Sequence, residues 1–251
     1  MQKNTAVKVL SLILLIIGIF GIAFTVYQSQ MLKRSGTKEI LSSSVSSKKS
    51  DISEETNGLP NVKTSDWQLV LVNRENKHDE MNPTLTQVDN ISVDSRIASH
   101  VKDFLAAARS IDPSEHLISG YRSVAYQKEL FEQYVQTEMS NDVSLTREQA
   151  EELVKTYSQP AGASEHQTGL AIDMSTVDSL NDSNQDVVKQ LQELAPNYGF
   201  ILRFESNKHH FTGVGYEDWH FRYVGKASAK YMTEHQLSLE EYIMLLKENG
   251  K

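Results

Sequence analysis

The stretch SEHQTGLAID, Ser164 to Asp173, places His166 and Asp173 seven residues apart around a glycine. If the GLAIDM part of this region is a strand, its side chains alternate between two faces. The apolar residues Leu170, Ile172 and Met174 then point one way and Asp173 points the other way. This stretch therefore predicts a strand that buries an apolar row in the core and presents one carboxylate on the opposite face.

A second stretch, YEDWHFRYVG from Tyr216 to Gly225, has the same alternation. One predicted face carries Trp219, Phe221 and Tyr223, and the other carries His220, Arg222 and Val224. Glu217 precedes His220 by three residues, so it has the wrong parity to join His220 on a straight strand. We therefore expect a bend near Asp218.

Together the two stretches offer the side chains of a catalytic zinc site. Such a site takes two imidazoles and one carboxylate from the protein, leaves a fourth position to water, and needs a further carboxylate as base. His166, Asp173 and His220 fill the ligand roles and Glu217 fills the role of base. Taken alone, a buried aspartate is usually a hydrogen-bonded structural group and a lone histidine an ordinary residue. Nitrogen and oxygen ligands also hold manganese or iron.

Composition limits the possible classes of protein. The 251 residues are 39% hydrophobic and 23% charged, with a net charge of -8, which suits one anchored globular domain of under about two hundred residues. The sequence has no basic stripe or stacking motif, so a nucleic-acid partner is not expected. The chain has no cysteine. This excludes a thiol nucleophile, a cysteine zinc site, disulfides and lipid attachment through an N-terminal cysteine.

The N-terminal region predicts a membrane anchor. After a short cytoplasmic segment, residues 1–8, the stretch VLSLILLIIGIFGIAFTVY at 9–27 has no charge over about the length that a bilayer core requires. It is longer than the apolar part of most signal peptides and no clear cleavage site follows, although a cleaved signal peptide is the alternative. The Ser-rich residues 28–60 predict a flexible tether, and 61–251 the folded domain.

Periodicity predicts five helices and several short strands in this domain. The predicted helices are Val93 to Ile111, Ala125 to Met139, Thr146 to Tyr157, Asp186 to Tyr198 and Leu239 to Lys247. Besides the two stretches above, strands are predicted in WQLVLVN at 67–73, in HLIS at 116–119 and in GFILRF at 199–204. Thr146 and Gln149 have the spacing of a capping box. The predicted helices come mostly early in the domain and the strands late, without regular alternation between the two. This order predicts an α+β domain with a small, mainly antiparallel sheet.

Three motifs in this chain, SGYRS at 119–123, SEHQTGLAID and EDWHFRYVG, resemble those of the VanY-type D-alanyl-D-alanine carboxypeptidases, which read SGYRS, SxHxxGxAxD and ExWHFRYVG. The resemblance runs from roughly residue 69 to 224. It implies a fold like that of hedgehog and DD-peptidase domains, with one zinc ion on the sheet held by His166, Asp173 and His220. It also implies that Glu217 is the general base, taking a proton from water and delivering it to the leaving amine.

The resemblance further implies that Arg122, Gln127 and Ser164 hold substrate, and that Arg122 also takes part in catalysis. The donor fork of an arginine matches a carboxylate or a developing oxyanion. The alternatives are a structural ion pair for Arg122 and an ordinary turn residue for Ser164. One position departs from the family, which usually has proline where this chain has Asp218, so no locked φ enforces the predicted bend.

Two other features near the predicted site have weaker implications. Asp218 offers extra negative charge beside the metal. His209 and His210 are close to the second stretch in sequence, but adjacent histidines point apart on an extended chain. We assign these two histidines to a loop or to the substrate rim rather than to the metal.

The resemblance implies a monomeric zinc carboxypeptidase that removes the C-terminal D-alanine from peptidoglycan stem peptides. The anchor at 9–27 would place it in the cell membrane as a single-pass protein with its catalytic domain on the cell-wall side. Cleavage of an L,D bond in a tetrapeptide is favoured over a D,D bond in a pentapeptide, because the arrangement of SGYRS and SEHQTGLAID looks most like that of L,D-cleaving members.

Two alternative functions are compatible with parts of the sequence. A serine penicillin-binding carboxypeptidase needs an S-x-x-K motif, and the match at Ser46 to Lys49 lies inside the tether, without S-D-N or K-T-G. A non-catalytic cell-wall binding module on the same fold is the second alternative. An intact Glu217 argues against such a module, because a pure binder has no need of a base beside its metal.

Overall fold

The computed structural model describes residues 58–178 and 182–251, and the fold is given for these residues. The predicted anchor at 9–27 and all but the last three residues of the predicted tether lie outside them. Among the described helices, none has both the length and the apolar character needed to cross a bilayer.

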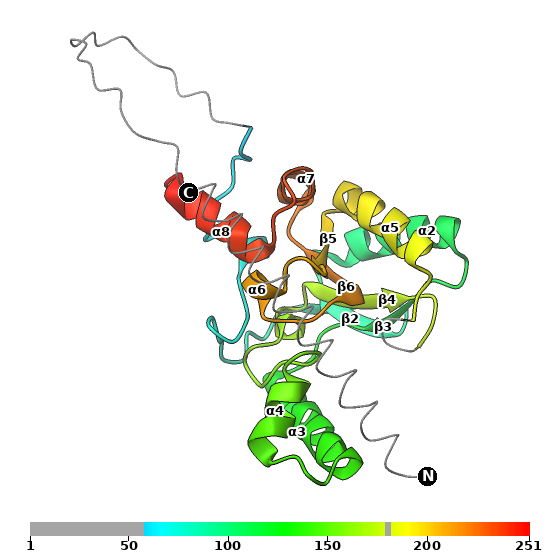
Figure 1. Ribbon diagram of the computed structural model, residues 1–251. Helices are drawn as coiled ribbons and strands as arrows, with labels where there is room; N and C mark the ends of the chain where they lie inside the picture. The colour runs from blue at the N-terminus through cyan, green and yellow to red at the C-terminus, as the bar shows by residue number, and fades with distance from the viewer. Residues whose placement is uncertain (1–57, 179–181) are drawn as a thin grey trace, which may run out of the picture. The chain divides into compact units, whose positions relative to one another are not determined.

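Six short strands form two antiparallel sheets (Figure 1). The strands are β1 Leu85–Val88, β2 Ile91–Asp94, β3 His116–Ser119, β4 Ala171–Ser175, β5 Phe200–Phe204 and β6 Glu217–Tyr223. β1 and β2 pair as a hairpin, and the other four strands form a sheet in the order β3-β4-β6-β5. Every described strand pairing is antiparallel, so the predicted α+β fold with a mainly antiparallel sheet is confirmed.

Seven helices and three single turns of 3₁₀-helix surround the sheets in the described part of the chain. The helices are α2 Ala98–Ile111, α3 Val124–Asn141, α4 Arg147–Val154, α5 Gln185–Leu194, α6 His209–Thr212, α7 Lys226–Glu234 and α8 Leu239–Glu248. The 3₁₀ turns are η1 Trp67–Leu69, η2 Glu165–Thr168 and η3 Ala195–Tyr198. Four predicted helices are confirmed within a few residues, and the Thr146 capping box is present.

The four-stranded sheet separates two hydrophobic clusters. On one face, Ile172 and Phe221 pack with apolar residues of α2 and α5, the two helices that lie together beside the sheet in Figure 1. A second cluster joins Ile201 of β5 to α7 and α8. Alternate residues of β4, β5 and β6 therefore face opposite sides of the sheet. The polar residues that alternate with Ile172 and Phe221 lie on the side away from α2 and α5.

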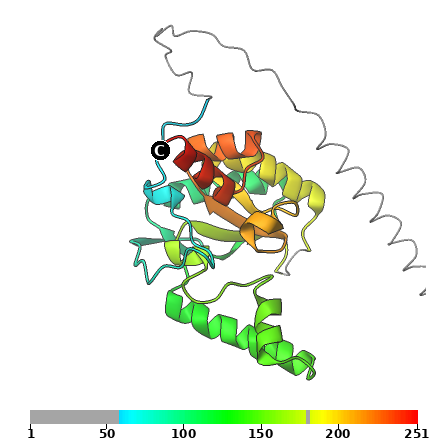
Figure 2. The same ribbon diagram turned by 60° about the vertical axis from the view of Figure 1, so that its left-hand side comes forward.

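Helices α3 and α4 form a hairpin that stands away from the sheet in both views (Figures 1 and 2). It has a small core of its own around Val135, Ala150 and Val154. Tyr157, which follows α4, packs its ring against that of Tyr134 on α3, with the ring centroids 5.5 Å apart. The hairpin thereby brings two tyrosines to the side of the cavity described below.

The predicted strand at 67–73 is wrong. Residues 67–69 form the η1 turn, and the chain continues without strand pairing. Leu69 is buried as the apolar pattern predicts, but the carbonyl oxygens of Gln68 and Val70 accept hydrogen bonds from the Arg222 guanidinium at 3.1 and 2.7 Å. A side chain thus satisfies the backbone groups that a neighbouring strand would have paired.

The predicted helix at 93–111 begins too early, since its first residues belong to β2 and α2 starts at Ala98. The β1–β2 hairpin was not predicted. Its turn is made by Asp89, which has a positive φ of 48°, and Asn90. Asp94 at the end of β2 donates its backbone N–H to the carbonyl oxygen of Gly169, so this strand end is bound to the first motif.

Candidate active site

The two strands that carry the predicted ligands are neighbours in the sheet. Asp173 on β4 lies opposite His220 on β6, and the preceding Ile172 lies opposite Phe221 in the core. The predicted alternation is confirmed at these positions, but Trp219, predicted to share the face of Phe221, lines the cavity described below together with His220. Since the register puts Asp173 and His220 on the same face, the sheet itself brings the carboxylate and the imidazole together.

His166 reaches the same place from the η2 turn. Gly169 ends that turn with a φ of 69°, and a Cβ added there would lie 2.8 Å from the backbone nitrogen of Asp94. His166 Nδ1 lies 2.7 Å from the carbonyl oxygen of Gly120, which can only accept a hydrogen bond. The Nδ1 atom therefore carries the proton, and the lone pair of Nε2 is left facing Asp173.

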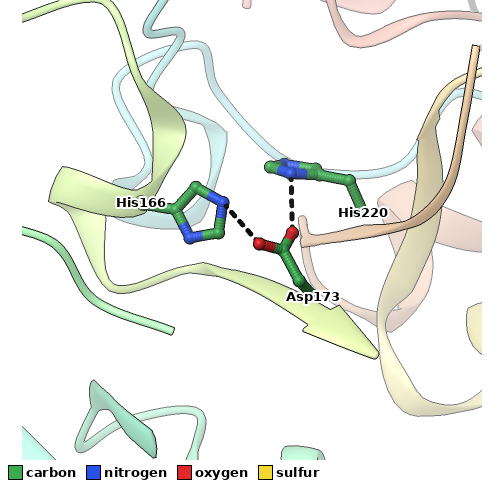
Figure 3. A group of neighbouring side chains, drawn as sticks. All are labelled: His166, Asp173 and His220. Carbon is green, nitrogen blue, oxygen red and sulfur yellow. Dashed lines mark ion pairs between the residues drawn. The ribbon is translucent and has the colours of Figure 1, made fainter. Parts of the chain in front are cut away.

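These three side chains form a group that fits a divalent metal (Figure 3). His166 Nε2 is 3.3 Å from Asp173 Oδ2, and His220 Nδ1 is 3.2 Å from Asp173 Oδ1. One ligand atom from each residue lies within 4.8 Å of the others, and all three residues are buried. Two imidazoles and a carboxylate match the protein ligands of a catalytic zinc site.

Glu165, next to His166 in sequence, supports the other imidazole. Its Oε2 lies 3.3 Å from His220 Nε2, whereas His220 Nδ1 faces Asp173, so a metal held on Nδ1 would leave the Nε2 proton to Glu165. Burial would raise the pKa of Glu165, but the neighbouring Arg203 and Arg222 guanidinium groups outweigh it and hold that pKa well below its usual range. This role of Glu165 could not be predicted from the sequence, because its partners come from strands that are distant along the chain.

The protonation of His220 depends on the same contacts. Burial works against the charged imidazolium, but hydrogen bonds to Asp173 and Glu165 outweigh it and raise the pKa of His220 to about 9. Because a metal needs the lone pair of Nδ1, metal and proton compete for this atom.

The bend that the sequence requires is present in β6. Leu202 pairs with Phe221 whereas Phe204 pairs with Glu217, so two steps along β5 match four along β6. Within this irregular stretch Glu217 lies on the same side as His220, and its Oε2 lies 3.7 Å from His220 Nδ1. Burial raises the pKa of Glu217 to about 8, and the nearby His220 offsets part of that rise. A bound divalent cation would lower this pKa again.

The metal-ligand group opens into a cavity whose wall includes Arg122, Ser164 and Glu217. The Nε of Arg122 is buried without a hydrogen-bond partner, and among the described residues Arg122 makes no ion pair. This arrangement favours a donor held ready for an anionic group over the structural ion pair considered as the alternative. Tyr134 and Tyr157 of the helical hairpin complete this side of the wall.

Gln127 does not line this cavity. Its side chain is buried and donates from Nε2 to the carbonyl oxygen of Gln159 at 2.6 Å, with a second contact to Ser158 Oγ at 3.3 Å. Both of these partners do line the cavity. The structure therefore places Gln127 behind the wall, where it supports the 158–159 segment.

The residues with weaker predictions lie outside the cavity. Asp218 accepts a hydrogen bond from Gln185 Nε2 of α5 at 3.3 Å, so its carboxylate faces that helix. His209 and His210 belong to α6, where His209 Nδ1 lies 2.9 Å from the carbonyl oxygen of Val214. The prediction that these two histidines lie in a loop or at the substrate rim is wrong, because both are in a helix and neither lines the cavity.

Comparisons with known proteins agree with this geometry. The VanY family, described as D-alanyl-D-alanine carboxypeptidase, matches residues 90–226. A D-alanyl-D-alanine carboxypeptidase of Enterococcus faecalis is 34% identical over 180 residues, which are 71% of this chain and 66% of that protein. The chain spans between 51% and 66% of the length of three curated relatives that it matches.

Solved structures show the same likeness. A variant of the D,D-pentapeptidase VanY from a VanB-type vancomycin resistance cassette, in complex with Zn(II), is 34% identical with a TM-score of 0.63, covering 71% of this chain and 99% of that one. The L,D-carboxypeptidase LdcB is 31% identical with a TM-score of 0.56, covering 69% and 84%. Since the family match spans more than half of the sequence and includes every predicted ligand, this chain belongs to the VanY family of D-alanyl-D-alanine carboxypeptidases.

Proposed function

We propose that this protein is a zinc-dependent carboxypeptidase that removes the C-terminal D-alanine from peptidoglycan stem peptides. The observation that carries the proposal is the buried group of His166, Asp173 and His220 with the Glu217 carboxylate 3.7 Å from His220 Nδ1. Relatives that carry the name D-alanyl-D-alanine carboxypeptidase, and a related structure in complex with Zn(II), support the substrate and the metal.

The residues of the site have distinct roles in this proposal. His166, Asp173 and His220 would hold the zinc, which when bound lowers the pKa of a coordinated water towards about 7 and polarises the scissile carbonyl. Glu217 would accept the proton of the attacking water and deliver it to the leaving amine. Arg122 would direct its unpaired Nε–H towards the substrate carboxylate or the developing oxyanion.

The other two residues predicted to hold substrate, Ser164 and Gln127, differ in their position relative to the cavity. Ser164 lies in the cavity wall and would donate its hydroxyl hydrogen to the terminal carboxylate of the substrate. Gln127 would act on substrate through the 158–159 segment that its amide holds.

For the bond that is cut, we propose an L,D preference, with the tetrapeptide as the better substrate. Its basis is the arrangement of the SGYRS and SEHQTGLAID motifs, together with a relative that is named an L,D-carboxypeptidase. The competing candidate is D,D-cleavage of the pentapeptide, which the name of the VanY D,D-pentapeptidase favours.

Mass spectrometry of purified tetrapeptide and pentapeptide stems, incubated with the full chain, tests these proposals. We expect loss of one alanine from the tetrapeptide at the higher rate, abolition of the loss by a chelator, and no effect of penicillin. Faster trimming of the pentapeptide would reverse the bond preference alone. Zinc binding without trimming of either peptide would instead identify a non-catalytic cell-wall binding module.

We also propose that residues 9–27 anchor the protein in the cell membrane and that the catalytic domain lies on the cell-wall side as a monomer. The uncharged stretch has about the length of a bilayer core, and the proposed substrate lies outside the membrane. Protease accessibility in intact protoplasts tests the orientation, because an external domain is cleaved without lysis. A domain that survives until lysis would refute it.

A further inference from the structure

A chain of buried ionic contacts connects the C-terminal helix α8 to the metal ligand His220. Glu240 on α8 accepts two hydrogen bonds from Arg203, at 3.0 Å from Nη1 and 2.6 Å from Nη2. Arg203 also donates from Nε to Glu165 Oε1 at 2.9 Å, and Glu165 Oε2 faces His220 Nε2 at 3.3 Å. The side chains of Arg203 and Glu165 are only 1% and 2% exposed, so little water competes with these contacts.

The two oxygens of Glu165 have different partners. Oε1 accepts from both Arg203 and Arg222, at 2.9 and 2.8 Å, whereas Oε2 faces His220 Nε2. Two guanidinium groups, from Arg203 and Arg222, face two carboxylates, from Glu165 and Glu240, so the buried charges balance. Removing one member leaves a buried charge without compensation, which costs far more than the intact network contributes.

The segments that hold this network lie outside the part of the chain that matches the family. The match covers residues 90–226, whereas Glu240 follows it and the carbonyl groups of Gln68 and Val70, which accept from Arg222, precede it. The two arginines are thus held from both flanking segments. The family motifs supply the metal ligands, and these flanking segments fix the carboxylate behind one of them.

We propose that Glu240 is a positioning residue for the metal centre, acting through Arg203 and Glu165 on the imidazole of His220. With Arg203 held by two parallel hydrogen bonds, Glu165 keeps Oε2 on His220 Nε2 and so keeps the Nδ1 lone pair directed at the metal position. The proposal rests on the metal site of the proposed function, and it adds a role for α8 that the family motifs do not contain.

Zinc affinity of the full-chain Glu240→Gln variant tests this inference, measured by competition with a chromophoric chelator. We expect the affinity to fall by about 10-fold, the lower end of what loss of an outer-shell partner costs. The visible absorption spectrum of the cobalt-substituted protein should change as well, because the ring of His220 is held less firmly. The Glu240→Asp variant, which keeps the charge, should recover part of the lost affinity.

Glu241→Gln is the matched control. Glu241 neighbours Glu240 on α8 and pairs with Lys208 at 2.8 Å, and glutamine can still accept from Ser238 in the capping box. We expect this control to keep the zinc affinity and the cobalt spectrum of the wild type. Equal losses in both variants would overturn the inference, because they would reflect general damage to α8.

An unchanged zinc affinity and cobalt spectrum in Glu240→Gln would also overturn the inference. If that variant does not fold, Arg203→Lys keeps the charge but loses the parallel pair of hydrogen bonds, and it should show the same fall in affinity. Wild-type affinity in Arg203→Lys would contradict the inference equally. A wild-type chain that fails to bind zinc would refute the proposed function itself, so the two failures are distinguishable.

Discussion

Asp173 on β4 and His220 on β6 are direct cross-strand neighbours, with 3.2 Å between Oδ1 and Nδ1. Because the sheet register fixes this pair before any metal binds, the Asp173→Asn variant should fold normally but bind zinc poorly. We expect its zinc affinity to fall by more than the roughly 10- to 100-fold that loss of an outer-shell partner costs. Calorimetric titration with zinc measures the affinity, and circular dichroism checks the fold.

The control for that prediction is Asp178→Asn, the same chemical change at an exposed carboxylate. Asp178 contacts His116 at 2.9 Å, and its side chain is 94% exposed. This control should bind zinc as the wild type does. Tight zinc binding by Asp173→Asn would mean that the three side chains do not hold the metal.

Glu217→Gln separates metal binding from turnover. The change keeps the size of the side chain but removes the base, so we expect D-alanine release to fall by about 100- to 10,000-fold while the zinc affinity is maintained. Release of D-alanine from stem peptides and zinc titration of the same sample provide the two measurements. Glu193→Gln, at an exposed position of α5, serves as a control that should retain full activity. Undiminished release by Glu217→Gln would exclude Glu217 as the general base.

The parts of the site that could be predicted from sequence are those that local alternation determines. Parity along two strands correctly placed Asp173 and His220 on one face, and the wrong parity of Glu217 correctly required a bend. Such inferences succeed because the period of a strand depends only on its own backbone.

What could not be predicted depends on partners that are distant in sequence. The apolar pattern of 67–73 is typical of a strand, but the guanidinium of Arg222 takes two of its carbonyl groups, so no strand forms. The role of Glu165 was missed for the same reason, since its partners are Arg203 and Arg222. The β1–β2 hairpin did have a local signal, an Asp-Asn turn at 89–90, which fits residues with a positive φ.

Glu115 predicts a specific dependence of stability on pH. The residue is 1% exposed, neither of its carboxylate oxygens has a hydrogen-bond partner, and burial raises its pKa from 4.5 to about 7. The folded state therefore holds this proton more tightly than the unfolded state does, and stability falls as the pH rises from about 4.5 to about 7. We expect Glu115→Gln to unfold like the wild type at pH 4 and to be more stable at pH 8, by roughly 1–3 kcal/mol.

Urea unfolding at both pH values measures that difference, and comparison of variant with wild type cancels the contribution of other titrating groups. Glu129→Gln, at an exposed position of α3, should show no such change with pH. A stability difference between Glu115→Gln and the wild type that is the same at pH 4 and pH 8 would contradict a buried, protonated Glu115.

Gly169 predicts a coupling between backbone conformation and metal binding. Alanine there must adopt a φ of 69° and place Cβ 2.8 Å from the backbone nitrogen of Asp94, whereas alanine at Gly250 has a φ of 70° and meets nothing within 4 Å. Gly250→Ala should therefore lower the free energy of unfolding by about 1 kcal/mol, the cost of the left-handed conformation alone, and Gly169→Ala by more than about 2 kcal/mol. Since Gly169 ends the turn that carries His166, zinc affinity should fall only in Gly169→Ala. Equal effects of the two substitutions on stability, or unchanged zinc affinity in Gly169→Ala, would show that the close packing against Asp94 does not position His166.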